Sequence, residues 1–174
     1  MKKLRAALIG CGRIGTKKHI EAFAANSDMI DLVAVCDLVP EKAERAAEEY
    51  MKRREISLNR GDEERIREED ETQNGQSRLP SSPASKPDLQ RPRVISDYKE
   101  LFSSQIDFVT IATESGNHYK NTIDFLSAGK HVLVEKPMAL SSEHMDQMIA
   151  LSREKNLKLA VCVQNRFNPP VQEL

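Results

Sequence analysis

Short apolar runs that alternate with stretches of helical periodicity constrain the fold of this chain more than any other feature. Each run has the length of a buried β-strand and is bounded by polar or turn residues. Strands that alternate with helices are typical of a parallel sheet with helices on both faces and right-handed crossovers. We therefore expect an α/β fold with a doubly wound parallel sheet, whose strands cover residues 4–9, 30–36, 93–96, 106–112, 131–134 and 157–163.

Capping and turn residues mark the ends of the helices between these strands. The helices are expected over residues 13–26, 41–51 and 117–128, with another that starts at Ser141 or Ser142. Pro40 suits a first helical turn, and Gly129 fits the position just past a helix end. Asp97 and Glu100 match a capping box, in which the Asp97 side chain accepts a hydrogen bond from the N–H of Glu100.

Residues 53–92 interrupt this pattern. Residues 52–71 contain fourteen charged residues, and residues 77–92 contain four of the eight prolines and four serines. Such a composition buries too little apolar surface to offset the entropy cost of ordering the chain. We expect residues 53–92 to form an insertion, with a helical extension followed by a mobile loop. The insertion is either a solvated surface segment without function, or a lid or an oligomer contact.

A glycine motif lies directly between the first predicted strand and the helix that follows it. Gly10 permits a tight turn, Gly12 leaves room for a pyrophosphate, and Gly15 lets the helix pack closely on the strand. The free N–H groups and the positive end of the helix dipole favour phosphate. In this context the motif predicts a Rossmann-type fold and a dinucleotide-binding loop that includes Arg13 and Ile14. A plain glycine turn is the alternative.

Asp37 ends the second predicted strand, 22 residues after Gly15. A carboxylate at this position can accept hydrogen bonds from an adenosine ribose, and its charge repels a 2′-phosphate. The next residue is Leu38 rather than arginine, so the sequence favours NAD over NADP. The alternative is a capping role for Asp37 before Pro40, and the two roles are compatible.

Polar residues follow two other predicted strands at the ends where parallel sheets bind ligands. Thr113 follows one of these strands, and Glu135 and Lys136 follow the other. A lysine there can donate hydrogen bonds to a substrate hydroxyl and stabilise its oxygen as the proton leaves during hydride transfer. The alternative is a surface lysine that forms an ion pair with Glu135.

Several motifs occur together in order: the glycine loop, "IAT", "NH", "AGKHVLVEKPMA" and "QNRFNP". Except for residues 53–92, the chain resembles the Gfo/Idh/MocA oxidoreductases, nicotinamide-dependent dehydrogenases of sugars and cyclitols. The resemblance implies that Lys136 is the active-site lysine and that Glu135 lies near the nicotinamide ribose. It also implies that Lys136 lies in the coenzyme cleft, and that this cleft or the substrate site is lined by Thr113, Asn117, His118, Gln164 and Arg166. "IATESGNH" with "VCVQNRFNP" is similar to the branch that oxidises UDP-N-acetyl-sugars at the 3-position.

The same resemblance implies a second α/β domain, which carries most of the substrate pocket and is missing from this sequence. We expect a coenzyme-binding domain over residues 1–165 and the start of a connection over residues 166–174. His118 and His131 are expected to be cleft or structural residues rather than the proton acceptor. The chain alone is expected to bind NAD weakly and to be inactive. The alternatives are a non-catalytic NAD-binding sensor or interaction module and a truncated gene product.

Charge and cysteine usage exclude other function classes. The 174 residues carry a formal net charge of −1, which gives no electrostatic reason to expect nucleic acid or a membrane surface as partner. No apolar run approaches the roughly 20 residues of a membrane span. The three cysteines, Cys11, Cys36 and Cys162, are odd in number and lack metal-site spacing. We therefore expect reduced thiols, no metal and a cytoplasmic protein. The family resemblance implies a homo-oligomer at full length.

Overall fold

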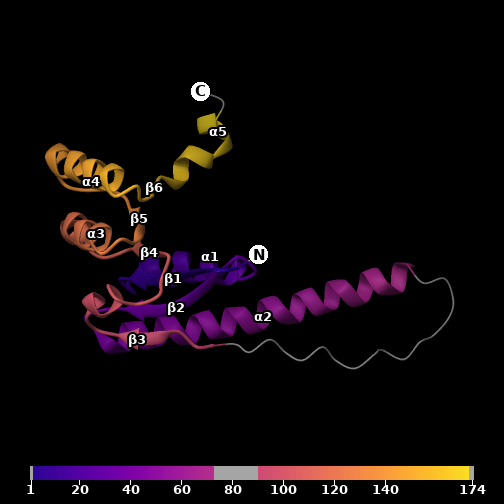
Figure 1. Ribbon diagram of the computed structural model, residues 1–174. Helices are drawn as coiled ribbons and strands as arrows, with labels where there is room; N and C mark the ends of the chain where they lie inside the picture. Colours follow the sequence, from indigo (N-terminus) through magenta and orange to yellow (C-terminus); the bar gives the residue numbers. More distant parts are fainter. Residues whose placement is uncertain (1, 73–89, 173–174) are drawn as a thin grey trace.

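The computed structural model describes residues 2–72 and 90–172, with the side chains of these residues apart from 58–72, 167 and 170. Its centre is a parallel sheet of six strands in the order β3-β2-β1-β4-β5-β6 (Figure 1). The strands are β1 (Leu4–Ile9), β2 (Ile30–Cys36), β3 (Arg93–Ile95), β4 (Phe108–Ile111), β5 (His131–Glu135) and β6 (Leu159–Cys162). The predicted doubly wound, Rossmann-type sheet is confirmed.

Helices cover both faces of the sheet because successive strand residues point to opposite faces. Leu8 belongs to a buried cluster with Ile20 of α1 (Ile20–Ala25) and with the small side chains of α2 (Pro40–Thr72). Ile9, the next residue, belongs to a second cluster with Phe125 of α3 (His118–Ser127) and Met148 of α4 (Ser142–Glu154). A short α5 (Pro169–Gln172) follows β6 at the end of the described chain (Figure 1).

Helix α2 is longer than the predicted helix over residues 41–51. It begins at Pro40, as expected, and its backbone stays helical to Thr72, so the first part of the predicted insertion extends the helix (Figure 1). Good helix formers such as glutamate and arginine dominate this charged stretch. The predicted mobile loop falls mainly on residues 73–89, which lie outside the described residues. Within the described helices, none combines the length and the apolar character that crossing a membrane requires.

The predicted capping box at Asp97 is wrong in its partner. The Asp97 side chain accepts from the N–H of Lys99 at 2.9 Å, whereas the N–H of Glu100 donates to the Asp97 carbonyl oxygen. The Glu100 carboxylate lies 3.8 Å from Arg93 instead of reaching back to Asp97. The reason is that residues Tyr98–Leu101 form a single 3₁₀ turn, which is tighter than the α-helical turn that a capping box requires.

The helix start predicted at Ser141 or Ser142 and the helix end predicted before Gly129 are confirmed. Ser141 caps α4, since its hydroxyl accepts from the N–H of His144 at 3.2 Å. Gly129 follows α3 with φ +75°, a left-handed conformation that glycine adopts without a steric penalty.

Candidate coenzyme site

The loops that follow β1, β4, β5 and β6 lie at one edge of the sheet, beyond the carboxyl ends of the strands. The strand order reverses between β1 and β4, which are neighbours in the sheet although β2 and β3 come between them in sequence. A ligand crevice in an open α/β sheet is expected at this reversal. The glycine loop follows β1 directly, so it lies at the mouth of this crevice.

The three glycines of the loop are required for different reasons. Gly10 has φ +94°, and a Cβ there would lie 2.5 Å from the Ala112 carbonyl oxygen, at the end of β4. A Cβ on Gly15 would collide with the Gly10 carbonyl oxygen. A Cβ on Gly12 would meet no atom within 4 Å, so the fold does not need a glycine at that position. The open space over Gly12 therefore fits a pyrophosphate lying against the backbone, which is the role that the motif predicts.

Asp37 lies against the glycine loop. One of its carboxylate oxygens accepts from the Cys11 N–H at 2.8 Å, and the other accepts from the Val39 N–H at 2.9 Å. The second hydrogen bond forms a turn just before Pro40, but its donor, Val39, precedes α2, so this bond does not cap an N–H group of the helix as the capping alternative expected. The half-buried carboxylate also faces the loop, which is compatible with a further role toward a ribose.

Cys11, within the glycine loop, and Cys36, the last residue of β2, have protonated thiols at neutral pH. Burial, together with the nearby Asp37 carboxylate, raises the pKa of both Cys11 and Cys36 to about 12. The thiolate is the reactive form of cysteine, so neither residue is suited to nucleophilic chemistry here. All three cysteines are free.

His118 connects the end of β4 with the segment that follows β5. The residue is 1% exposed, and its ring nitrogens lie 2.7 Å from the Pro137 carbonyl oxygen and 3.0 Å from that of Thr113. The Thr113 hydroxyl donates to the Asn121 side chain at 3.1 Å. His118 is thus a structural residue that joins two loops of the site. His131 accepts from the N–H of Lys158 at the opposite edge of the sheet.

The remaining predicted site residues are exposed at the edge of the sheet that carries the glycine loop. Asn117 precedes α3, and Gln164 and Arg166 lie in a 3₁₀ turn directly after β6. Arg13 and Ile14 are also exposed and begin the first helix, immediately after Gly12. Exposed side chains at this edge are free to contact a coenzyme or a substrate.

Lys136 is exposed at the carboxyl end of β5, and its bond to Pro137 is cis. The alternative ion pair between Lys136 and Glu135 is not present, since only the backbone N–H of Lys136 donates to the Glu135 carboxylate, at 3.1 Å. Among the residues that the structure describes, no carboxylate lies within ion-pair distance of the Lys136 ammonium group. The lysine therefore remains available to a ligand in the crevice.

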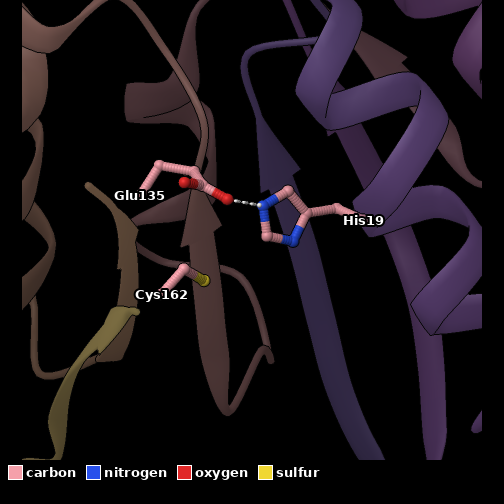
Figure 2. Close-up of side chains that lie close together, drawn as sticks. All are labelled: His19, Glu135 and Cys162. Carbon is pink, nitrogen blue, oxygen red and sulfur yellow. Dashed lines mark hydrogen bonds and ion pairs between the residues drawn. The ribbon is translucent and has the colours of Figure 1, made fainter. Parts of the chain in front are cut away.

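Glu135 instead contacts His19, a residue that the sequence analysis did not single out (Figure 2). The His19 Nε2 lies 2.8 Å from a Glu135 carboxylate oxygen, and the two side chains are only 11% and 15% exposed. Cys162, from β6, lies beside them, and burial together with the negative charge of Glu135 raises the pKa of its thiol to about 11. Figure 2 shows the three side chains converging from three separate elements.

A π-helical turn over Gly15–His19 precedes α1 and carries His19. π-Helical turns are rare in proteins overall, and those that occur are frequently found at functional sites. The sequence signal for this contact was a histidine four residues after Gly15, the last glycine of the loop. Helical spacing alone does not show that the side chain of this histidine reaches β5. The ligand atoms of His19, Glu135 and Cys162 lie within 4.8 Å of one another, a spacing that a metal ion could also occupy. The hydrogen bond between His19 and Glu135 already accounts for their contact. Glu135 directly precedes Lys136, so the cluster belongs to the candidate coenzyme site.

Replacing His19 with alanine is expected to lower the free energy of unfolding by about 1–3 kcal/mol, because it removes the only side-chain hydrogen-bond partner that the described residues give the mostly buried Glu135 carboxylate. His19→Gln should lose less, since the glutamine amide can still donate to Glu135. Urea unfolding of the chain measures both changes. His144→Ala is the control, because His144 stacks on Tyr119 at the surface and contacts no carboxylate of this cluster. Equal stability of His19→Ala and the unchanged chain would mean that the pair contributes nothing.

The sheet order, the glycine loop with open space over Gly12, and Asp37 against that loop define a dinucleotide-binding domain of the Rossmann class. Residues 4–58 and 70–163 match the model of the Gfo/Idh/MocA family, an oxidoreductase family with an NAD-binding Rossmann fold. The chain belongs to this family. The unmatched residues between these two ranges lie within the predicted insertion.

Known proteins of this kind are similar to the chain but much longer. D-glucoside 3-dehydrogenase of Escherichia coli strain K12 is 26% identical over 171 residues, which cover 98% of this chain and 38% of that protein. UDP-N-acetylglucosamine 3-dehydrogenase of Acidithiobacillus ferrooxidans is 34% identical over 71 residues, 41% of this chain and 23% of that protein. The crystal structure of the WlbA dehydrogenase from Chromobacterium violaceum, in complex with NADH and UDP-GlcNAcA, has a TM-score of 0.73 and 26% identity, covering 99% of this chain and 39% of that one. The chain thus spans well under half the length of these relatives.

Proposed function

We propose that the chain is the coenzyme-binding domain of a dehydrogenase that transfers hydride between NAD and a hydroxyl group of a sugar, a nucleotide sugar or a cyclitol. The observation that carries the proposal is the glycine loop, where Gly12 faces open space and Asp37 bonds the loop backbone. Family membership supports the same coenzyme class.

In this proposal the pyrophosphate of the coenzyme lies against the loop from Gly10 to Gly15, with Arg13 and Ile14 beside it. Asp37 accepts hydrogen bonds from the adenosine ribose. Glu135 lies toward the nicotinamide ribose and is held there by His19. The rest of the cleft is formed by Thr113, Asn117, Gln164 and Arg166, and buried His118 holds two of its loops together. When bound, the nicotinamide supplies the hydride chemistry, and the protein supplies orientation and electrostatics.

Lys136 is the proposed catalytic residue. It is exposed at the carboxyl end of β5 and is in no ion pair with the described residues, so its ammonium group can donate to a substrate oxygen. A positive charge beside that oxygen stabilises the alkoxide that forms as the hydroxyl proton leaves. The proton acceptor itself is proposed to lie in a second domain, so hydride transfer requires more than residues 1–165.

The names of two relatives support nucleotide sugars, and UDP-N-acetyl-hexosamines in particular, as the substrate class. Two relatives named as 3-dehydrogenases, one of them of a D-glucoside, support oxidation at the 3-position. We propose that residues 166–174 begin the connection to the substrate domain and that 53–92 is an insertion in the coenzyme domain. A cytoplasmic homo-oligomer is the proposed working form, which is consistent with three free thiols.

The choice of NAD over NADP is tested by Asp37→Asn. The asparagine oxygen can still accept from the Cys11 N–H, so the loop keeps its hydrogen bond while the negative charge is removed. We expect the unchanged chain to bind NAD at least about tenfold more tightly than NADP, and the variant to lose most of that preference. Calorimetric titration of both coenzymes measures it, with Asp31→Asn near the start of β2 as the control. Tighter binding of NADP by the unchanged chain contradicts the assignment.

A further inference from the structure

A pocket at the amino-terminal edge of the sheet, opposite the coenzyme site, has no role in the proposed function. Its volume is about 580 Å³, and it lies between α2 and the ends where β1, β2 and β3 begin. The charged residues of its lining are Lys3, Arg5, Asp31, Arg54, Arg91 and Arg93. Five of these six residues are cationic, so the pocket favours an anion.

Arg54, on α2, points to a ligand more strongly than the other lining residues. It is only 8% exposed, and its Nε has no hydrogen-bond partner among the residues that the structure describes. A buried N–H that makes no hydrogen bond is costly, and more so in a charged group. Because Arg54 lines the pocket, an oxyanion bound there can accept from this N–H.

The other cations differ in how they are neutralised. Three of them form ion pairs with carboxylates: Lys3 with Asp31 at 3.5 Å, Arg93 with Glu100 at 3.8 Å, and Arg91 with Glu44. The Arg5 guanidinium donates instead to the neutral side-chain amide of Gln105, at 3.3 Å. Within residues 2–57 and 90–172, the ion pairs involve neither Arg5 nor Arg54. Two guanidinium groups of the pocket thus lack a counter-charge in that part of the chain.

The pocket also has walls that suit an organic group. Tyr50 and Leu32 line it and are 4% and 3% exposed. Burial raises the pKa of Tyr50, so its hydroxyl stays protonated at neutral pH. A volume of about 580 Å³ is much larger than an inorganic phosphate needs and lies within the range of small-molecule sites.

We propose that this pocket binds a small phosphate ester, whose phosphate is held by the guanidinium groups of Arg5 and Arg54 and whose organic part lies against Tyr50 and Leu32. The planar guanidinium fork matches the geometry of phosphate oxygens and stays charged at all physiological pH values. The six residues of β1, at about 3.3 Å each, separate the pocket from the glycine loop by about 20 Å. The two sites can therefore be occupied together.

The experiment is calorimetric titration of the 174-residue chain at constant ionic strength with glucose 6-phosphate, inorganic phosphate and glucose. We expect glucose 6-phosphate to bind more tightly than inorganic phosphate, and glucose not to bind. Affinity for glucose 6-phosphate should be unchanged when the chain is saturated with NADH. Equal affinity for inorganic phosphate and the ester overturns the ester assignment in favour of a free phosphate. Loss of binding in the presence of NADH overturns the separate site, because the phosphate would then lie in the glycine loop.

The variants are Arg54→Met, which keeps an apolar side chain of similar length, and Arg93→Gln at the exposed rim. Arg54→Met is expected to weaken glucose 6-phosphate binding by at least about tenfold, and Arg93→Gln by less, because Arg93 already has a carboxylate partner. The matched control is Arg53→Met, since Arg53 pairs with Glu49 and Glu21 and does not line the pocket. Should Arg54→Met fold poorly, Arg5→Gln tests the same claim. Unchanged affinity in a folded Arg54 or Arg5 variant, or no binding by the unchanged chain up to about 10 mM ligand, contradicts the proposal.

Discussion

Replacing Lys136 with alanine is expected to lower kcat by about 100- to 10,000-fold in a form of the protein that carries a substrate domain. The change removes the one cation proposed to stabilise the substrate oxygen as the proton leaves. Lys136 is exposed and its ammonium group holds no carboxylate of the described chain, so the fold should not depend on it. Steady-state turnover with nucleotide sugars measures the effect.

The affinity for NAD separates a catalytic role of Lys136 from a structural one. NAD affinity should change by no more than about twofold, because the lysine is assigned to the substrate rather than to the coenzyme. Lys155→Ala, at the exposed end of α4, is the control for loss of a surface charge. Unchanged turnover in Lys136→Ala would remove the catalytic assignment and favour a non-catalytic NAD-binding sensor or interaction module.

Replacing Gly12 with valine is expected to weaken NADH binding by at least about 100-fold while the chain stays folded. A Cβ at Gly12 meets no protein atom within 4 Å, so a side chain can start at this position without striking the protein. The same side chain occupies the space proposed for the pyrophosphate, and a ligand cannot approach the backbone past it. NADH fluorescence titration measures affinity, and the thermal unfolding midpoint measures the fold.

Gly12→Ala provides a graded comparison, because its single methyl group blocks less of the space. Its affinity should lie between those of the unchanged chain and Gly12→Val. Gly10→Ala is the contrasting variant, since it must accept φ +94° and a Cβ 2.5 Å from the Ala112 carbonyl oxygen. That variant is expected to lose stability first. If Gly12→Val binds NADH as well as the unchanged chain does, the coenzyme does not lie on this loop.

Local patterns predicted the strands and most helix ends correctly because each depends on neighbouring residues. The apolar run over residues 30–36 matches β2, and Gly129 follows α3 with the positive φ that its position suggested. The capping box at Asp97 failed because the turn after it is a 3₁₀ turn, and sequence spacing does not distinguish 3₁₀ from α-helical turns. The helical extension expected at the start of residues 53–92 is present in α2. Its last residue, Thr72, was not predicted, because charged residues can extend a helix without an apolar stripe that marks its end.

Contacts between residues far apart in the chain were not accessible in this way. His19 and Glu135 are 116 residues apart, and their hydrogen bond depends on how a π-helical turn and the end of β5 are placed in space. The pocket proposed to bind a phosphate ester is likewise lined by residues from the start of β1, the middle of α2 and the start of β3. No spacing rule links such positions, because their distance is set by the packing of the whole sheet.

The order of amino acids therefore decided the architecture, the glycine loop and the class of coenzyme, since strand length, helical periodicity and the need for glycine act over a few residues. The folded molecule decided which side chains meet. Parallel strands gather residues from distant parts of the chain at the same edge, and this brought His19 to Glu135 while leaving Lys136 open to a ligand. It also placed Arg54 in a basic pocket at the other edge, because only packing determines which charges lose their contact with water.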